Sequence, residues 1–436
     1  MVSSKMRIKV TESTLIPPSK PTPSEKLWNS NLDLVVGRIH ILTVYFYRPN
    51  GSQNFFDSRT VKEALSNVLV SFYPMAGRLG RDQEGRVEID CNAKGVLYVE
   101  AESDNVVDDY GDFRPSLELR RLVPEVDYSG DISSCPLFIA QVTRFKCGGV
   151  ALGCGVHHTL SDGLSSLHFI NTWSDISRGL SIAIPPFIDR TLLRARDPPT
   201  PVFDHVEYHP PPSLNTPEAV KSPKAPTTTV LKLTLEQLNQ IKSTAKSDGN
   251  AKDHSTYEIL SAHLWRCACK ARGLSDDQMT KLYVATDGRF RLSPPLPPGY
   301  LGNVVFTATP AGTAGEIISE PLVNSAKRIH AALSKMGNEN LRSALDFLEC
   351  QPDLSALVRG PQYFASPNLN INSWTRLPIY DSDFGWGRPI HMGPAVILYE
   401  GTIYVIPSPT NDRSVSLSVC LDADHVEKFK KFLYEF

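Results

Sequence analysis

A proline-rich segment near the middle of the chain limits what this sequence can fold into. Residues 185–226 hold 11 of the 34 prolines, including three in a row from Pro210. Because proline fixes φ and has no amide proton, this stretch cannot continue a helix or a central strand. It therefore predicts an extended crossover that links an N-terminal domain, residues 1–184, to a C-terminal domain, residues 227–436.

Hydrophobic patterns on both sides of the crossover interleave helices with strands. Apolar residues follow helical spacing after Asp57 and again from Val426 to Phe436. Thr234 and Ser255 each stand three residues before a Gln or Glu, which is the spacing of a capping box at a helix start. The expected fold class is therefore α/β, with two similar-sized domains that each contain a mixed sheet and flanking helices.

Composition excludes several classes of partner. With 41% apolar and 21% charged residues the chain is typical of globular proteins. Its formal net charge of -2 gives no reason to expect a nucleic acid or an anionic membrane surface as a partner. The N-terminus shows no apolar signal-peptide core, and no segment reaches the length of a membrane span. We expect a cytoplasmic protein, and no sequence feature demands more than a monomer.

The segment His157-His158-Thr159-Leu-Ser-Asp162-Gly follows the apolar run 150–156, which predicts a strand. A histidine at a strand end is held rigidly and can reach a crevice, and its pKa suits proton transfer near neutral pH. The plainer interpretation is a hydrogen-bonded core histidine. A zinc site is disfavoured, because adjacent residues of an extended segment point to opposite faces. A serine hydrolase is also disfavoured, since the sequence contains no G-x-S-x-G motif.

A second motif, Asp383-Phe-Gly385-Trp386-Gly387, packs two glycines and two aromatics into five residues. The glycines permit close backbone approach, while the aromatics can anchor a loop. The motif alone is compatible with any structural turn. Part of 375–400 is expected to pack with the N-terminal domain.

Together, the two motifs on either side of the crossover resemble those of the plant BAHD acyl-CoA acyltransferases, and the resemblance covers essentially the whole chain. It extends to further segments, namely 28–34, 73–78, 287–291 and 300–303. Within the family, the chain is similar to the hydroxycinnamoyl-CoA shikimate/quinate branch. The segments that carry this similarity are 357–360, 372–378 and 407–411.

The resemblance implies an active site in a channel between the domains, with acyl-CoA as a substrate and neither a cofactor nor a metal. His158 is the implied general base, and Trp374 the implied donor to the oxyanion of the intermediate. Asp162 is implied to be structural and paired with an arginine, for which Arg289 and Arg291 are both candidates.

Other positions match the parts of the family that bind substrate. Arg359 corresponds to the residue that holds the carboxylate of the acceptor, a role that suits a planar guanidinium. Thr43 and Tyr45 correspond to hydroxyl-bearing positions of the acceptor pocket. Ser255, at a helix start, is a candidate contact for a phosphate of CoA.

Two positions depart from the shikimate pattern. Thr159 stands where those enzymes usually have a second histidine, and Asn372 replaces a threonine near the acceptor. The sequence around them, 366–372 and 391–394, looks like that of the quinate-preferring transferases. Because an Asn side chain both donates and accepts, it can accommodate the additional hydroxyl of quinate. The expected reaction is transfer of a p-coumaroyl or caffeoyl group from CoA to quinate. The alternatives are shikimate or another hydroxy acid as acceptor, a catalytically silent binding protein, and a zinc hydrolase.

Overall fold

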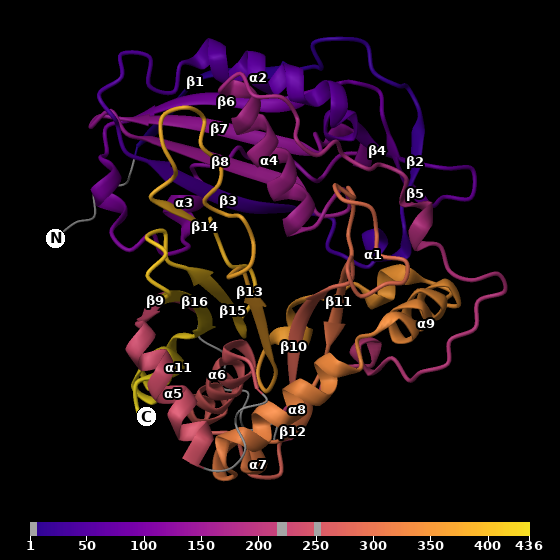
Figure 1. The fold of residues 1–436 in the computed structure, drawn as a ribbon, viewed down its shortest axis with the longest axis vertical. Helices are drawn as coiled ribbons and strands as arrows, with labels where there is room; N and C mark the ends of the chain where they lie inside the picture. The colour runs from indigo at the N-terminus through magenta and orange to yellow at the C-terminus, as the bar shows by residue number, and fades with distance from the viewer. Residues whose placement is uncertain (1–6, 216–224, 248–253) are drawn as a thin grey trace.

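The computed structural model describes residues 7–215, 225–247 and 254–436, which form two large sheets with helices around them (Figure 1). Within these ranges the N-terminal sheet has six strands in the order β1-β6-β7-β8-β3-β14. Only β6 and β7 run parallel, so the sheet is mixed as predicted. Its strands are β1 (Ile8–Ile16), β3 (His40–Tyr47), β6 (Val96–Ser103), β7 (Phe138–Phe145), β8 (Val150–His157) and β14 (His391–Pro394).

The C-terminal sheet of the described chain has seven strands and is also mixed. Its main path is β11-β10-β13-β15-β16-β9, with β12 beside β10, and β13 runs parallel to both of its neighbours. The strands are β9 (Pro226–Leu233), β10 (Met279–Asp287), β11 (Val305–Ala308), β12 (Ala311–Thr313), β13 (Leu369–Ser373), β15 (Thr402–Pro407) and β16 (Val415–Asp422). A small third sheet contains β2 (Lys26–Trp28), β4 (Arg78–Arg81) and β5 (Val87–Asp90).

The helices flank the sheets. Those of the N-terminal half are α1 (Asn31–Leu34), α2 (Ser58–Ser71), α3 (Leu117–Arg120) and α4 (Gly163–Ser177). Those of the C-terminal half are α5 (Leu235–Ser247), α6 (Thr256–Arg272), α7 (Ala314–Ser319), α8 (Leu322–Ser334), α9 (Asn338–Glu349), α10 (Pro361–Phe364) and α11 (Ala423–Leu433). The final helix is shorter than predicted, because Phe436 lies beyond its end and is half-exposed.

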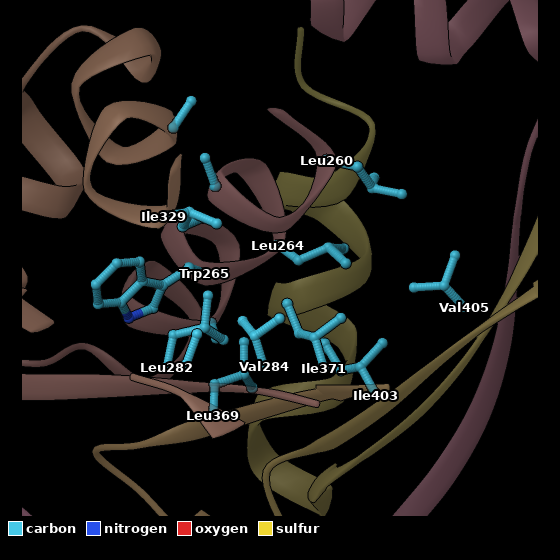
Figure 2. Packing of buried hydrophobic residues seen from close by; sticks show 14 of the residues in the cluster. Leu260, Leu264, Trp265, Leu282, Val284, Ile329, Leu369, Ile371, Ile403 and Val405 are labelled. Atoms are coloured by element: carbon cyan, nitrogen blue, oxygen red, sulfur yellow. The ribbon is translucent and has the colours of Figure 1, made fainter. Parts of the chain in front are cut away.

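Helix α6 shows how sequence, packing and position connect in the C-terminal half. Ser255 caps its first turn and Gly273, in the left-handed region, ends it. Because α6 is apolar on most sides, it is buried between the sheet and other helices. Figure 2 shows Leu264 and Trp265 of α6 facing Val284 of β10 and the neighbouring strands.

One segment of the C-terminal half crosses into the N-terminal half. Strand β14 pairs antiparallel with β3, with Met392 opposite Tyr45. The segment before it, which includes Phe384 and Trp386, packs in the same apolar cluster as α2 and α4. In Figure 1 this part of the chain rises over the N-terminal sheet. The two halves are therefore joined by strand pairing as well as by the crossover.

Part of the predicted crossover, residues 216–224, lies outside the described residues. The described part, 185–215, contains only short helical turns and no strand, in keeping with its prolines. The division into residues 1–184, 185–226 and 227–436 stays a prediction. No helix in the described part of the chain is long and apolar enough to cross a membrane.

Candidate active site

The central feature of the site is the turn that follows β8. The backbone N–H of His158 donates to the carbonyl of Ile39 (2.9 Å), which lies beside β3. The carbonyl of His158 accepts from the side-chain amide of Asn303, 2.8 Å away. The backbone of His158 is thus held by contacts to both halves of the chain. Its imidazole is therefore not needed to hold the turn in place.

The imidazole of His158 is held in its neutral form. Burial lowers its pKa below 6.5, opposed by its own backbone carbonyl, the charge of Asp162 and the carbonyl of Ser161. Its Nδ1 is buried and makes no regular hydrogen bond in the described structure. A neutral imidazole keeps a lone pair on one of its two ring nitrogens, which is what a general base requires.

Asp162 follows His158 in the same motif, but its carboxylate binds an arginine and two backbone amides. Its carboxylate receives Arg289 through both terminal nitrogens, at 2.8 and 2.9 Å, and the backbone amides of Ser165 and Val304 at 3.0 and 2.9 Å. Burial raises the pKa of Asp162, but Arg289 and these amides outweigh it and hold the pKa below its ordinary value. Asp162 therefore stays ionised and braces the loop.

The other candidate arginine, Arg291, has different partners. Its terminal nitrogen donates to the carbonyls of Leu333 and Met336, at 3.3 and 3.1 Å. The structure therefore pairs Asp162 with Arg289, a choice that the sequence left open.

A second buried network supports the same turn and was not predicted. Asp33 accepts from the backbone and side-chain amides of Asn303, both at 2.8 Å, while Arg190 lies 3.3 Å from its other oxygen. Asn303 in turn holds the carbonyl of His158. The signal was present in the sequence, because both 28–34 and 300–303 were among the segments of the resemblance, but nothing local indicated that they meet.

Trp374 and Asn372 lie at the end of β13. The backbone N–H of Trp374 donates to Val405 (2.8 Å), and its indole stands edge-on to Tyr404 at 5.1 Å between ring centroids. No acceptor among the described residues is hydrogen-bonded to Trp374 Nε1. Burial raises the pKa of Tyr404 to about 12, opposed by a hydrogen bond with the side chain of Asn372. Both predicted side chains thus offer polar atoms at one strand end.

Arg359 is held between aromatic rings. Its guanidinium lies 5.3 Å from the ring centroid of Tyr208 and 5.8 Å from that of Tyr283. One terminal nitrogen donates to the hydroxyl of Thr307 (2.7 Å) and the other to the carbonyl of Glu207 (3.1 Å). The two accepting groups are a hydroxyl and a backbone carbonyl, and neither carries a negative charge. The guanidinium therefore keeps its charge available to an anionic ligand.

Three positions predicted to line the acceptor pocket differ in exposure. Thr43 is half-buried on β3, whereas Tyr45 is fully buried and its hydroxyl makes no regular hydrogen bond within the described structure. Burial raises the pKa of Tyr45 well above its ordinary value, so the phenol stays protonated. Thr159 is also buried, in the turn beside His158. Their role in binding the acceptor stays a prediction, as does the channel.

Ser255, the candidate for a CoA phosphate, is engaged within its own helix. Its hydroxyl donates to Glu258 Oε2 (2.9 Å) and accepts from the backbone amide of Glu258 (3.3 Å). This is a complete capping box, so a phosphate has to compete with Glu258 for the same donors. The contact to CoA stays a prediction.

The second motif lies apart from His158. Asp383 Oδ1 accepts from the amides of Gly385 and Gly387, at 2.8 and 2.9 Å, and both glycines have φ above 100°. Trp386 stacks on Phe56 with 5.2 Å between ring centroids. The motif is a loop that folds on itself and docks on the N-terminal core.

Comparison with known proteins bears on the whole chain. A model of the Transferase family matches residues 6–436. Shikimate O-hydroxycinnamoyltransferase of Nicotiana tabacum is 60% identical over 99% of this chain and 100% of that protein. Hydroxycinnamoyltransferase of Narcissus pseudonarcissus is 57% identical over 99% of this chain and 100% of its own. The crystal structure of vinorine synthase superposes with a TM-score of 0.74 at 23% identity, covering 97% and 96% of the two chains.

These matches confirm the two-domain fold and the family resemblance. The structural match shows the fold, and the family and sequence matches show the relationship over nearly every residue. The chain belongs to the BAHD family of acyltransferases.

Proposed function

We propose that this acyltransferase transfers a hydroxycinnamoyl group, p-coumaroyl or caffeoyl, from CoA to a hydroxyl of quinate. The observation that carries the proposal is the position of His158, half-buried between Ile39 and Asn303 of the two halves, while Asp162 is paired with Arg289. The acyl group is supported by the names of the two relatives that are 60% and 57% identical.

The reaction starts with proton transfer to His158. Its Nε2 accepts the proton of the acceptor hydroxyl while the oxygen attacks the thioester carbonyl. The tetrahedral intermediate then collapses, the carbon–sulfur bond breaks, and the imidazolium returns its proton to the leaving thiolate. Because a thioester is already activated, no covalent enzyme intermediate is required.

Trp374 is the proposed donor to the oxyanion. Its indole is fixed at the end of β13 by the backbone bond to Val405 and by contact with Tyr404. A rigid donor without a competing acceptor gains a partner only when charge develops on the carbonyl oxygen, which favours the intermediate over the substrate.

Arg359 is the proposed binding site for the carboxylate of the acceptor. It is bonded to Thr307 of β11, and the same chain segment carries Asn303, which holds His158. Arg359 and His158 are thus both bonded to the segment 303–307, which places them on the same side of the C-terminal half. The carboxylate thereby orients one ring hydroxyl toward His158.

Quinate is proposed over shikimate because Asn372 offers both a donor and an acceptor near the site. The pKa of the neighbouring Tyr404 reflects a hydrogen bond with this amide. Shikimate is the second candidate acceptor, favoured because the tobacco relative is a shikimate O-hydroxycinnamoyltransferase.

The test is an assay of purified protein with p-coumaroyl-CoA or caffeoyl-CoA and equal concentrations of quinate or shikimate. Ester formation and CoA release should be faster with quinate. In His158→Ala, kcat should fall by about 10²–10⁴-fold with an unchanged melting temperature, because only the base is lost. His209→Gln, an exposed histidine elsewhere, is the control and should keep full activity.

A further variant separates acceptor binding from chemistry. Arg359→Met should raise KM for the acceptor while KM for the thioester stays the same. Preference for shikimate contradicts the acceptor but keeps the mechanism, whereas full activity of His158→Ala contradicts the mechanism itself. Absence of CoA release with either acceptor favours a silent binding protein.

A further inference from the structure

A cluster of potential metal ligands lies outside the proposed acyl-transfer site, between two helices of the C-terminal half. His254 directly precedes the cap of α6, Glu258 is in its first turn, and His330 is on α8. One ligand atom from each of the three lies within 4.8 Å of the other two. Two imidazoles and a carboxylate, from the start of α6 and from α8, therefore converge on one point.

The two carboxylate oxygens of Glu258 have different partners. Its Oε2 is used by the capping box, receiving the amide and hydroxyl of Ser255 at 2.6 and 2.9 Å. Its Oε1 points to Nδ1 of His330, 2.8 Å away. Because the capping box occupies only Oε2, a metal ion can bind Oε1 without uncapping α6.

His254 carries the second, independent observation. Its side chain is only 5% exposed, and its Nδ1 is buried with no hydrogen-bond partner among the described residues. This atom lies 4.0 Å from Oε2 of Glu258, too far for a hydrogen bond. The hydrogen bond between His330 and Glu258 accounts for two members of the cluster, but it leaves the buried Nδ1 of His254 without a partner among the described residues.

We propose that His254, Glu258 and His330 bind a divalent zinc ion. Imidazole nitrogen with one carboxylate oxygen is a donor set that zinc takes up readily, whereas Mg²⁺ and Ca²⁺ prefer oxygen alone. At zinc bond lengths, the ligand atoms of a tetrahedral site are about 3.3 Å apart. The cluster needs only a small contraction to reach this, and His330, which is half-exposed, is free to make it.

The proposed ion takes the place of the proton shared by His330 and Glu258. The Nδ1 atoms of His254 and His330 then act as ligands together with Oε1 of Glu258, and water completes the coordination. The ion links the first turn of α6 to α8. The same turn carries Tyr257, whose hydroxyl lies 3.5 Å from the carbonyl of Ile371 on β13. Zinc is therefore expected to stabilise the start of α6 and not to enter the acyl-transfer chemistry.

The test is titration of the EDTA-treated, dialysed full chain with Zn²⁺ by calorimetry, with Co²⁺ absorption as a spectroscopic readout of the donor set. The wild type should bind about one equivalent and gain thermal stability. His254→Gln and His330→Gln should each lose both the binding and the gain. His209→Gln is the matched control, because it too is 49% exposed and beside a carboxylate, that of Asp204.

Three outcomes overturn the proposal. These are absence of Zn²⁺ binding in the wild type, equal binding by both histidine variants, and loss of binding in His158→Ala instead. Since His330 is half-exposed, His330→Gln should fold normally, and its melting temperature without metal checks this directly.

Discussion

Two aspartates of two equally prominent motifs serve the fold in different ways. Asp162 is 2% exposed and receives Arg289, Ser165 and Val304, so its partners come from both halves of the chain. Asp383 receives the amides of two glycines in its own loop. The first aspartate joins distant segments beneath His158, while the second shapes a local turn.

The difference shows that a motif aspartate is not defined by its neighbours in sequence. The role of each aspartate depends on how far along the chain its partners lie. It also depends on how well those partners shield the carboxylate from water. A buried charge pair is costly to break, because removal of one partner leaves the other uncompensated. Removal of the half-buried carboxylate of Asp383 costs much less, since water can bond to the two loop amides in its place.

The largest effect is expected from Asp162→Ala. It leaves Arg289 buried with only Asp287 as a charged partner, and should lower the free energy of unfolding by about 3–5 kcal/mol. Urea denaturation measures the loss. The double variant Asp162→Ala/Arg289→Met should recover part of it, and strictly additive losses would show that the two side chains do not interact.

A smaller effect is expected from Asp383→Ala. The loop loses two hydrogen bonds, which should cost about 1 kcal/mol, while Trp386 remains docked on Phe56. Thermal unfolding and steady-state assays should show a slightly lower melting temperature and unchanged kcat/KM. A loss of activity as large as that of His158→Ala would place this motif in the chemistry and remove the contrast.

The smallest effect concerns pH. The active form of His158 is neutral and burial lowers its pKa, so the acid decline of kcat/KM should lie below the pH at which an ordinary imidazole titrates. The charge of Asp162 raises the pKa of His158, so Asp162→Asn should move this decline further toward acid. Asp383→Asn should leave it in place. A shift toward alkaline pH in Asp162→Asn contradicts the assignment.

Local features of the fold were predictable from sequence. The capping box of Ser255 and Glu258, the helix after Asp57 and the apolar strand that ends at His157 depend on residues a few positions apart. Such patterns encode backbone preference and one buried face, which are local properties.

The features that complete the site are not local. Asp33 and Asn303 bond across 270 positions, and nothing in either segment specifies the other. Strand β14 contains a glycine and a proline in four residues, so it shows no alternation, and its pairing with β3 depends on tertiary context. The roles of Trp374 and Arg359 rested on family resemblance, since a tryptophan or arginine alone most often serves packing or solvation.

The pairing of β14 with β3 also has a consequence during synthesis on the ribosome. The free edge of β3 is complete once Tyr47 is made, but its partner ends at Pro394. At ordinary elongation rates the edge waits for roughly 20 to 70 s. During that time its unpaired amides and carbonyls form a template for any other nascent strand. Expression of the N-terminal half alone would make this exposure permanent, so cutting the gene at the crossover should yield an aggregating fragment.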